Sequence, residues 1–345
     1  MKIIVAPDSF KGTMTSSEAA EAIRKGVLQA WPEADAVTVP LGDGGEGTVK
    51  AIADSLPNTK EITLPTLDPL GREIDASYII ADSHTAYIET AAASGLTLVA
   101  QEERDIMKSD TRGTGILIAD AFKKGIRKFM ICMGGTATCD GGYGCYQKMR
   151  EHGVKDIDIS ILCDVKNPLC GPNGAAAVFG PQKGATREEI LLLDRRLHEC
   201  AVFYKKTHGI DVTDIECAGA AGGLAGMLMA CYRARALSGI SKVLEILDFG
   251  SRIKDADMII TGEGGADATT LNGKAAKGIL DIASEQGIPV TLMAGRVADR
   301  EVLISAGFRH VVQATPRFSD PEVSYSDYLT QSTREFLKSL NINKC

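Results

Sequence analysis

The stretch "KIIVAPDSFKGTMTSSEAAEAIRKGVLQAWPEADAVTVP" (Lys2 to Pro40) holds two β-branched runs, "KIIVAP" and "AVTVP", on either side of a helical pattern. Thr15 and Glu18 have the spacing of a capping box at the start of that helix. A strand, a helix and a strand of this length form a right-handed parallel crossover. The stretch therefore predicts an α/β fold with a doubly wound parallel sheet, which binds ligands at the carboxyl ends of its strands. We expect the loops after the two strands, "APDSFKG" and "LGDGGEG", to lie side by side there.

The second loop also matches the dinucleotide-binding pattern G-x-G-x-x-G through Gly42, Gly44 and Gly47. That pattern works because bare glycine turns let backbone N–H groups approach a pyrophosphate closely. Here Asp43 and Glu46 stand within the turn, and two carboxylates repel phosphate unless a cation lies between them. A helix N-terminus also stabilises carboxylates, so local capping of a tight turn is an alternative interpretation. The pattern alone does not indicate an NAD-dependent enzyme.

Composition narrows the classes of protein. A length of 345 residues suffices for roughly two domains. The net charge of −7, the pI near 5.4 and the lack of a long Lys/Arg run argue against a nucleic-acid-binding protein. Neither a signal peptide nor an apolar spanning segment is evident, so we expect a cytoplasmic protein without membrane contact. Nine cysteines without a C-x-x-C pair and five histidines without ligand spacing argue against a disulfide framework and a structural zinc site.

The pattern of the chain changes at Lys60 to shorter runs, which predict antiparallel pairing around Asp82 to Thr85. Alternating elements follow: helices over 113–124, after Gly142 and from Thr186 with Glu189 as capping partner, and strands over 128–133 and 159–163. Near Asp255 the strand and helix alternation of the first stretch returns. We therefore expect a discontinuous Rossmann-like domain, residues 1–65 plus 250–345, interrupted by an inserted second α/β domain, residues 66–249.

Seven turns combine glycines or prolines with a carboxylate, a hydroxyl or a single cation. They are "APDSFKG", "GDGGEG", "SDTRGTG", "GGTATCDGG", "CDVKNPLCGPNGA", "FGPQKGA" and "TGEGGAD". Phosphoryl transfer requires such groups, because N–H nests and cations hold phosphates while carboxylates hold Mg²⁺ or accept a proton. Walker A, the protein-kinase signatures and G-x-S-x-G are all absent from the sequence, which excludes the P-loop, protein-kinase and serine-hydrolase classes.

Eight of the chain's segments, in order, resemble the type I glycerate kinase family. They are "KIIVAPDSFKGTMTSSEAAEAIRKG", "GDGGEGT", "IETAAASGL", "RGTG", "GGTATCDGG", "CDVKNPLCGPNGAAAVFGPQKGA", "AGAAGG" and "ITGEG". The resemblance implies ATP- and Mg²⁺-dependent phosphorylation of the small molecule D-glycerate, most often to 2-phosphoglycerate. It also implies a Rossmann-like domain interrupted by a second α/β domain, with the active site in the interdomain cleft, and we expect a monomer or homodimer.

The resemblance also implies roles for individual residues. Lys11 and Arg112 would hold the glycerate carboxylate or a phosphate, and the full substrate-binding set is Asp8, Ser9, Lys11, Asp43, Glu46, Arg112 and Thr114. ATP would be bound by Gly134, Gly135, Thr136, Lys183, Gly222, Gly223 and Glu263. Asp164 or Asp267 would act as the base, with Asp140 as the next candidate. Asp140 and Asp43 would bind the metal ion.

Three departures from the family pattern bear on activity rather than on fold. The chain is shortened near residues 145–160, Cys139 stands where Asn is usual, and Gly265 stands where the family has Arg. Loss of an arginine beside a phosphate site removes a charge-assisted donor. A paralogue that binds glycerate or nucleotide without turnover is therefore the alternative interpretation.

Overall fold

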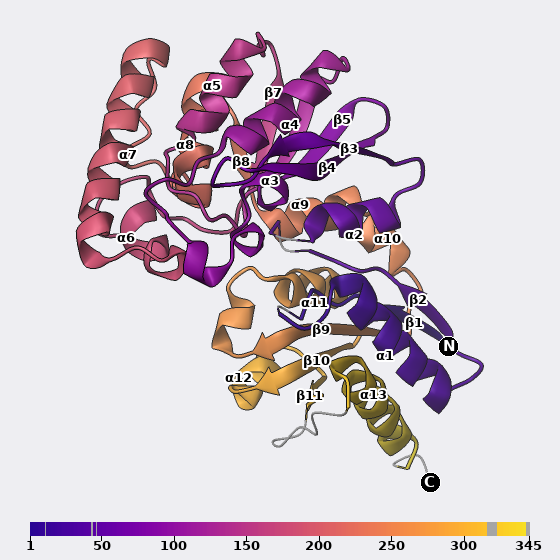
Figure 1. Cartoon of the computed structure of the whole chain (residues 1–345). Helices are drawn as coiled ribbons and strands as arrows, with labels where there is room; N and C mark the ends of the chain where they lie inside the picture. Colours follow the sequence, from indigo (N-terminus) through magenta and orange to yellow (C-terminus); the bar gives the residue numbers. More distant parts are fainter. Residues whose placement is uncertain (11, 43, 46, 316–322, 343–345) are drawn as a thin grey trace. The chain divides into compact units, whose positions relative to one another are not determined.

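The computed structural model describes residues 1–345 except 11, 43, 46, 316–322 and 343–345 (Figure 1). The chain divides into two compact units. Unit 1 comprises Met1–Asp43, Lys50–Ser55 and Ile240–Cys345, and unit 2 comprises Gly44–Val49 and Leu56–Gly239. Each unit has a sheet and a hydrophobic core of its own.

The described part of unit 1 is built on a five-stranded parallel sheet in the order β2-β1-β9-β10-β11. The strands are β1 (Lys2–Val5), β2 (Asp35–Thr38), β9 (Met258–Ala266), β10 (Val290–Val297) and β11 (His310–Gln313). Counted along the unit, this is the flavodoxin-like order 2-1-3-4-5, which reverses direction between β1 and β9. The predicted doubly wound parallel sheet is confirmed, and such a sheet binds ligands at the carboxyl ends of the two strands at the reversal.

Helices lie on both faces of this sheet (Figure 1). On one face, α1 (Ser16–Ala30) and α13 (Tyr325–Ile342) bury Ile23 and Leu337 with Ile3 and Val5 of β1. On the other, α11 (Ala275–Glu285) contacts β9 and β10. The remaining helices are α2 (Thr48–Ser55), α9 (Gly239–Ile246), α10 (Phe249–Arg252), the 3₁₀ helix η5 (Ala268–Leu271) and α12 (Arg300–Ser305).

Unit 2 is built on a mixed six-stranded sheet in the order β3-β4-β5-β6-β7-β8. The strands are β3 (Lys60–Leu67), β4 (Glu73–Ala81), β5 (Thr85–Glu89), β6 (Lys128–Cys132), β7 (Asp158–Leu162) and β8 (Arg235–Leu237). The pairs β3/β4 and β4/β5 are antiparallel, and the pairs from β5 to β8 are parallel. The antiparallel hairpin predicted around Asp82 to Thr85 is confirmed, since Ala81 pairs with Thr85.

The helices of unit 2 follow the strands of its parallel half. They are α3 (Ala91–Ser94), η1 (Leu96–Leu98), η2 (Gln101–Glu103), α4 (Arg112–Lys123), α5 (Tyr143–Glu151), α6 (Ala175–Phe179), η3 (Pro181–Lys183), α7 (Arg187–His208), η4 (Ala220–Gly223) and α8 (Leu224–Tyr232). Their apolar faces and the sheet share one core, in which Phe129, Leu117, Tyr204 and Leu228 are fully buried. Both predicted capping boxes are confirmed, Thr15 with Glu18 at α1 and Thr186 with Glu189 at α7.

The unit boundaries differ from the ones expected at residues 65/66 and 249/250. The first expected boundary falls inside β3, which pairs with β4 along its whole length. The chain enters unit 2 at Gly44, returns to unit 1 at Lys50, enters unit 2 again at Leu56 and returns to unit 1 at Ile240. The crossing at Leu56 precedes the change of sequence pattern at Lys60, so that pattern does not mark it.

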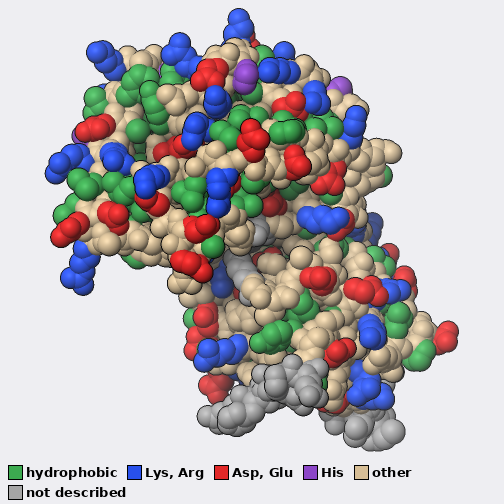
Figure 2. All heavy atoms as spheres, viewed as in Figure 1, with side chains coloured by type: hydrophobic (Ala, Val, Ile, Leu, Met, Phe, Trp, Pro, Cys, Tyr) green, Lys and Arg blue, Asp and Glu red, His purple; other side chains and the backbone are tan. Residues whose placement is uncertain are grey.

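The molecular surface carries charges of both signs. On the face in Figure 2, acidic and basic side chains alternate over both units without a large basic patch. In the described part of the chain, no helix is both long enough and apolar enough to cross a membrane.

Candidate active site

The first polar cluster lies at the carboxyl ends of β1 and β9 in unit 1. Asp8 follows β1, is 8% exposed, and its backbone N–H donates to the Gly262 carbonyl at 2.8 Å. Its Oδ1 accepts from the Ser9 N–H at 2.7 Å. The loop after β2 starts beside this turn, as expected, because the Leu41 N–H donates to the Pro7 carbonyl at 3.0 Å. Three residues expected in these loops, Lys11, Asp43 and Glu46, lie outside the described residues.

Two carboxylates follow along β9, in contrasting surroundings. Glu263 is buried, accepts from the Thr270 hydroxyl at 2.6 Å, and lies 3.5 Å from Lys274 Nζ. Burial raises the pKa of Glu263 above its ordinary value, while Thr270 and Lys274 oppose that shift. Asp267 instead caps η5, and hydrogen bonds from the Thr269 hydroxyl and N–H lower its pKa.

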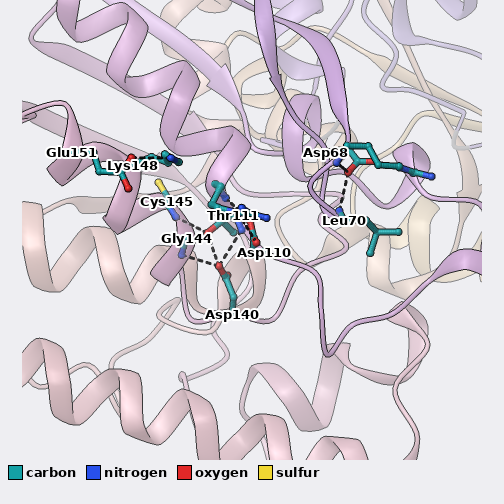
Figure 3. A network of polar contacts seen from close by, with 11 residues as sticks. Asp68, Leu70, Asp110, Thr111, Asp140, Gly144, Cys145, Lys148 and Glu151 are labelled. Atoms are coloured by element: carbon teal, nitrogen blue, oxygen red, sulfur yellow. Dashed lines mark hydrogen bonds and ion pairs between the residues drawn. The ribbon is translucent and has the colours of Figure 1, made fainter.

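In unit 2, Asp140 ties together the starts of α4 and α5 (Figure 3). Its Oδ2 accepts from the N–H and hydroxyl of Thr111, at 3.0 and 2.8 Å, and from the Gly144 N–H at 3.0 Å. Its Oδ1 accepts from the Gly142 N–H at 3.0 Å. Desolvation raises the pKa of Asp140 and these bonds oppose the shift. Each carboxylate oxygen has about two acceptor positions, so Oδ2 is fully engaged while Oδ1, with one bond, keeps a position for a further donor or a cation. The expected roles of Asp140 as metal ligand or base stay predictions.

Two residues at the start of α4 were expected to bind substrate, and they differ in accessibility. Arg112 is 39% exposed at its side chain, and its Nε donates to Asp110 Oδ2 at 2.7 Å. Its two Nη atoms donate no hydrogen bond to the residues that the structure describes. Thr114 is fully buried and shares a 2.8 Å hydrogen bond with the Ser94 hydroxyl. Arg112 can meet an anionic ligand, whereas Thr114 serves internal packing and not the substrate role expected for it.

Lys183 reaches the glycine turn that follows β6. Its Nζ donates to the Thr138 carbonyl at 2.8 Å and to the Thr136 hydroxyl at 3.1 Å. The structure thus brings together Lys183 and the turn of Gly134, Gly135 and Thr136, all expected to bind ATP. Lys183 is 4% exposed, and burial lowers its pKa to about 8.

Gly222 and Gly223 pack against the far end of the same turn. Both are buried with positive φ, and a Cβ on Gly222 would lie 2.0 Å from the Thr138 carbonyl oxygen. A Cβ on Gly223 would lie 2.7 Å from the Gly141 Cα. Close backbone packing requires a residue without a side chain at both positions, and the expected role of Gly222 and Gly223 in binding ATP stays a prediction.

Asp164 follows β7 on an exposed turn. Its Oδ1 accepts from the Gly239 N–H at 2.9 Å and from the Ser238 hydroxyl at 3.1 Å. These bonds fix the first residue of α9, where the chain leaves unit 2. Asp164 is the most exposed of the three carboxylates expected to act as base.

Three residues that contact the expected site residues were not predicted from the sequence. Thr111 belongs to the "SDTRGTG" turn and could have been found there by its hydroxyl. Lys274 follows Gly273 without a Ser or Thr after it, so no motif marks it. Asp110 carries no signal besides its proximity to Arg112 in the chain. Among the described residues, no three His, Cys, Asp or Glu side chains are placed to hold a metal ion.

Comparison with known proteins identifies relatives along the whole chain. The profile described as the glycerate kinase family matches residues 3–151 and 147–340. The glycerate kinase of Bacillus subtilis (strain 168) is 36% identical over 378 aligned positions, covering 100% of this chain and 99% of the relative. That alignment is 33 positions longer than the chain (378 less 345), so the relative has residues that this chain lacks.

Two further relatives agree with this match. The glycerate 2-kinase of Escherichia coli (strain K12) is 41% identical over 329 positions, covering 87% of this chain and 86% of the relative. A crystal structure from Salmonella typhimurium LT2, described as a "putative glycerate kinase 2", superposes with a TM-score of 0.84 at 34% identity. It covers 100% of this chain and 99% of its own.

Proposed function

The chain belongs to the glycerate kinase family, and on that premise we propose that it uses ATP to convert D-glycerate to 2-phosphoglycerate. Phosphorylation of glycerate follows from the family relationship. We propose the 2-hydroxyl as the phosphorylated group because the chain is 41% identical to a relative named glycerate 2-kinase. ATP is the donor because phosphoryl transfer by a kinase of this family implies a nucleotide.

The reaction needs one bond exchange and one proton transfer. The 2-hydroxyl oxygen of glycerate attacks the γ-phosphorus, and the new O–P bond forms as the bond to the bridging oxygen of ADP breaks. The hydroxyl proton passes to a carboxylate within hydrogen-bond reach. Positioning and charge stabilisation supply most of the rate enhancement in such reactions.

We propose Asp164 as the base. Asp140 already accepts four hydrogen bonds from Thr111, Gly142 and Gly144, which hold its carboxylate between the starts of α4 and α5. Asp267 has a lowered pKa because Thr269 donates to it twice, which weakens it as a proton acceptor. Asp164 is exposed, and its position is fixed through Oδ1 by Gly239 and Ser238.

The anionic groups of the substrates require cations and N–H donors. Arg112 is proposed to bind the glycerate carboxylate, because Asp110 holds its Nε while its Nη atoms face no described acceptor. Asp8 and Ser9 at the carboxyl end of β1 are proposed to bind substrate hydroxyls, with Lys11, Asp43 and Glu46 in the same loops. The nucleotide is proposed to bind at two places. One is the turn of 134–136, which Lys183 holds, and the other is the pair of Glu263 and Lys274.

Magnesium is proposed to accompany ATP. Mg²⁺ is commonly held by one or two carboxylates together with the substrate phosphates. The ion would neutralise charge on the transferred group, and a cluster of three protein ligands is not needed for that. Asp140 and Asp43 are its proposed ligands, and Oδ1 of Asp140, which accepts one hydrogen bond from the protein, keeps an acceptor position for the ion.

Phosphorus NMR of the protein incubated with ATP, Mg²⁺ and D-glycerate tests this proposal. We expect a 2-phosphoglycerate signal, and 3-phosphoglycerate would overturn the choice of hydroxyl. If ATP stays unchanged while ATP or glycerate raises the melting temperature, the protein binds its ligands without turnover, and the proposed kinase activity is overturned.

Substitution of Asp164 tests the base. Asp164→Asn keeps the acceptor oxygen for Gly239 and Ser238 but cannot take a proton, so we expect kcat to fall by about 10²- to 10⁴-fold. Ser238→Ala is the matched control, because it removes one hydrogen bond to Asp164 and leaves the carboxylate. If Asp164→Asn keeps the kcat of the parent, Asp164 is not the base. Asp267 is then the next candidate, and the kcat of Asp267→Asn tests it.

A further inference from the structure

Arg296 is an exposed cation near the carboxyl end of β10. Its side chain makes no hydrogen bond or ion pair with any residue in the described ranges. Its partner in the parallel ladder is Gly265 of β9. A Cβ built on Gly265 would meet no heavy atom within 4 Å, so the space over that strand is open beside Arg296.

The ladder also determines which side chains share this face. Paired positions of neighbouring strands point to the same face, and successive positions alternate between faces. Glu263 stands two positions before Gly265, so its side chain projects from the same face of the sheet as Arg296. Gly265 adds no side chain on this face, and at the neighbouring Gly295 a Cβ would lie 2.7 Å from the Gly264 carbonyl oxygen, so the two backbones approach closely there.

The carboxylates near this face are already hydrogen-bonded to other groups. Glu263 accepts from Thr270 and lies beside Lys274. Asp267 accepts from the N–H and hydroxyl of Thr269. Asp299 accepts from the Ala268 N–H at 3.0 Å. The positive charge of Arg296 therefore has no ion-pair partner in the described part of the chain, at the sheet edge where a doubly wound fold binds ligands.

We propose that Arg296 binds a phosphoryl group, either of the nucleotide or of the phosphorylated product. A guanidinium offers paired N–H donors that match two phosphate oxygens. The register makes Arg296 the nearest cross-strand neighbour of position 265, where the family resemblance leads one to expect arginine. Arg296 thus supplies from β10 the donor that Gly265 lacks on β9. This inference rests on the proposed phosphoryl transfer and assigns one of its binding residues.

Calorimetric titration with ATP, ADP and 2-phosphoglycerate tests the assignment without requiring turnover. We expect Arg296→Ala to weaken binding of at least one of these ligands by tenfold or more. Loss for ATP and ADP indicates a nucleotide phosphate, and loss for 2-phosphoglycerate alone indicates the product phosphate. The matched control is Arg309→Ala, since Arg309 is also exposed but lies at the opposite end of the sheet, where its N–H donates to Val290. Its removal should change affinity by less than twofold.

A second substitution separates loss of charge from loss of structure. Gly265 has no close neighbours and no positive φ, so arginine fits there without strain. Gly265→Arg in the Arg296→Ala background should recover most of the lost affinity. Unchanged binding of all three ligands by Arg296→Ala would overturn the proposal. With D-glycerate titrated as a fourth ligand, an equal loss of affinity for D-glycerate and 2-phosphoglycerate would also overturn it, because that loss points to the carboxylate. An unaltered parent that binds ATP through Arg296 but forms no product would refute the proposed function and leave this assignment standing.

Discussion

At Lys183 an ammonium group is enclosed by protein, and its two described hydrogen bonds go to a hydroxyl and a carbonyl, Thr136 and Thr138. No carboxylate forms an ion pair with it in the described part of the chain. Burial therefore disfavours its charged form and lowers its pKa from the ordinary 10.5 to about 8. The lysine holds the turn of 134–136 in place, but its buried charge lowers the free energy of unfolding at any pH at which the amine is protonated.

That cost has a defined sign. Between pH 8 and 10.5 the unfolded chain binds a proton at Lys183 that the folded chain has released, so stability rises with pH across this window. At 1.36 kcal/mol per pKa unit, the gain is about 3 kcal/mol. Lys183→Met lacks the group, so the difference in free energy of unfolding between parent and variant should shift in the parent's favour by that amount. Urea unfolding at pH 7, 9 and 10.5 measures it, and a difference that does not vary with pH would contradict a depressed pKa.

At the scale of elements, the contact between η4 and the turn before α5 depends on the missing side chain of Gly222. An alanine there combines positive φ with a Cβ 2.0 Å from the Thr138 carbonyl oxygen. We expect Gly222→Ala to lower the free energy of unfolding by about 2–4 kcal/mol. Gly209 is the matched control, because it ends α7 at φ 78° with no atom within 4 Å of a Cβ. Gly209→Ala should lower the free energy of unfolding by about 1 kcal/mol. If urea unfolding gives the same loss for both variants, the close contact between the new Cβ at position 222 and the Thr138 carbonyl oxygen contributes nothing.

Elements were more predictable from the sequence than side-chain roles. Capping boxes, strand runs and the hairpin are local, and Thr15, Thr186 and the turn after Ala81 stand where the patterns indicate. Accessibility is not local. Thr114 and Asp140 belong to turns rich in functional residue types, yet Thr114 is fully buried against Ser94. Asp140 accepts two of its four hydrogen bonds from Thr111, 29 positions away in the chain. The role proposed for Arg296 depends on the register of β10 with β9, which a sequence pattern does not specify.

At the scale of the whole molecule, the two cores are separate sets of residues. Every buried residue of the larger core lies between Ala76 and Ala234, and all six strands of its sheet lie between Lys60 and Leu237. We therefore expect a fragment of residues 56–239 to fold by itself, with a cooperative urea transition and native near-ultraviolet circular dichroism. A fragment of residues 240–345 lacks β1, the strand between β2 and β9, and should not fold. The absence of a transition in 56–239 would show that unit 2 depends on unit 1.

The pairing of β1 with β9 also has a consequence for the order of events on the ribosome. Ile3 pairs with Met258, and 255 positions separate them in the chain. At about 5–20 residues per second, β1 waits roughly 13–50 s for its partner to be synthesised. Unit 2 is complete by Gly239, before β9 has been translated. The growing chain thus carries a finished inserted unit while one edge of the N-terminal strand, "KIIV", still exposes unpaired N–H and C=O groups, and during this interval the nascent chain is most exposed to aggregation.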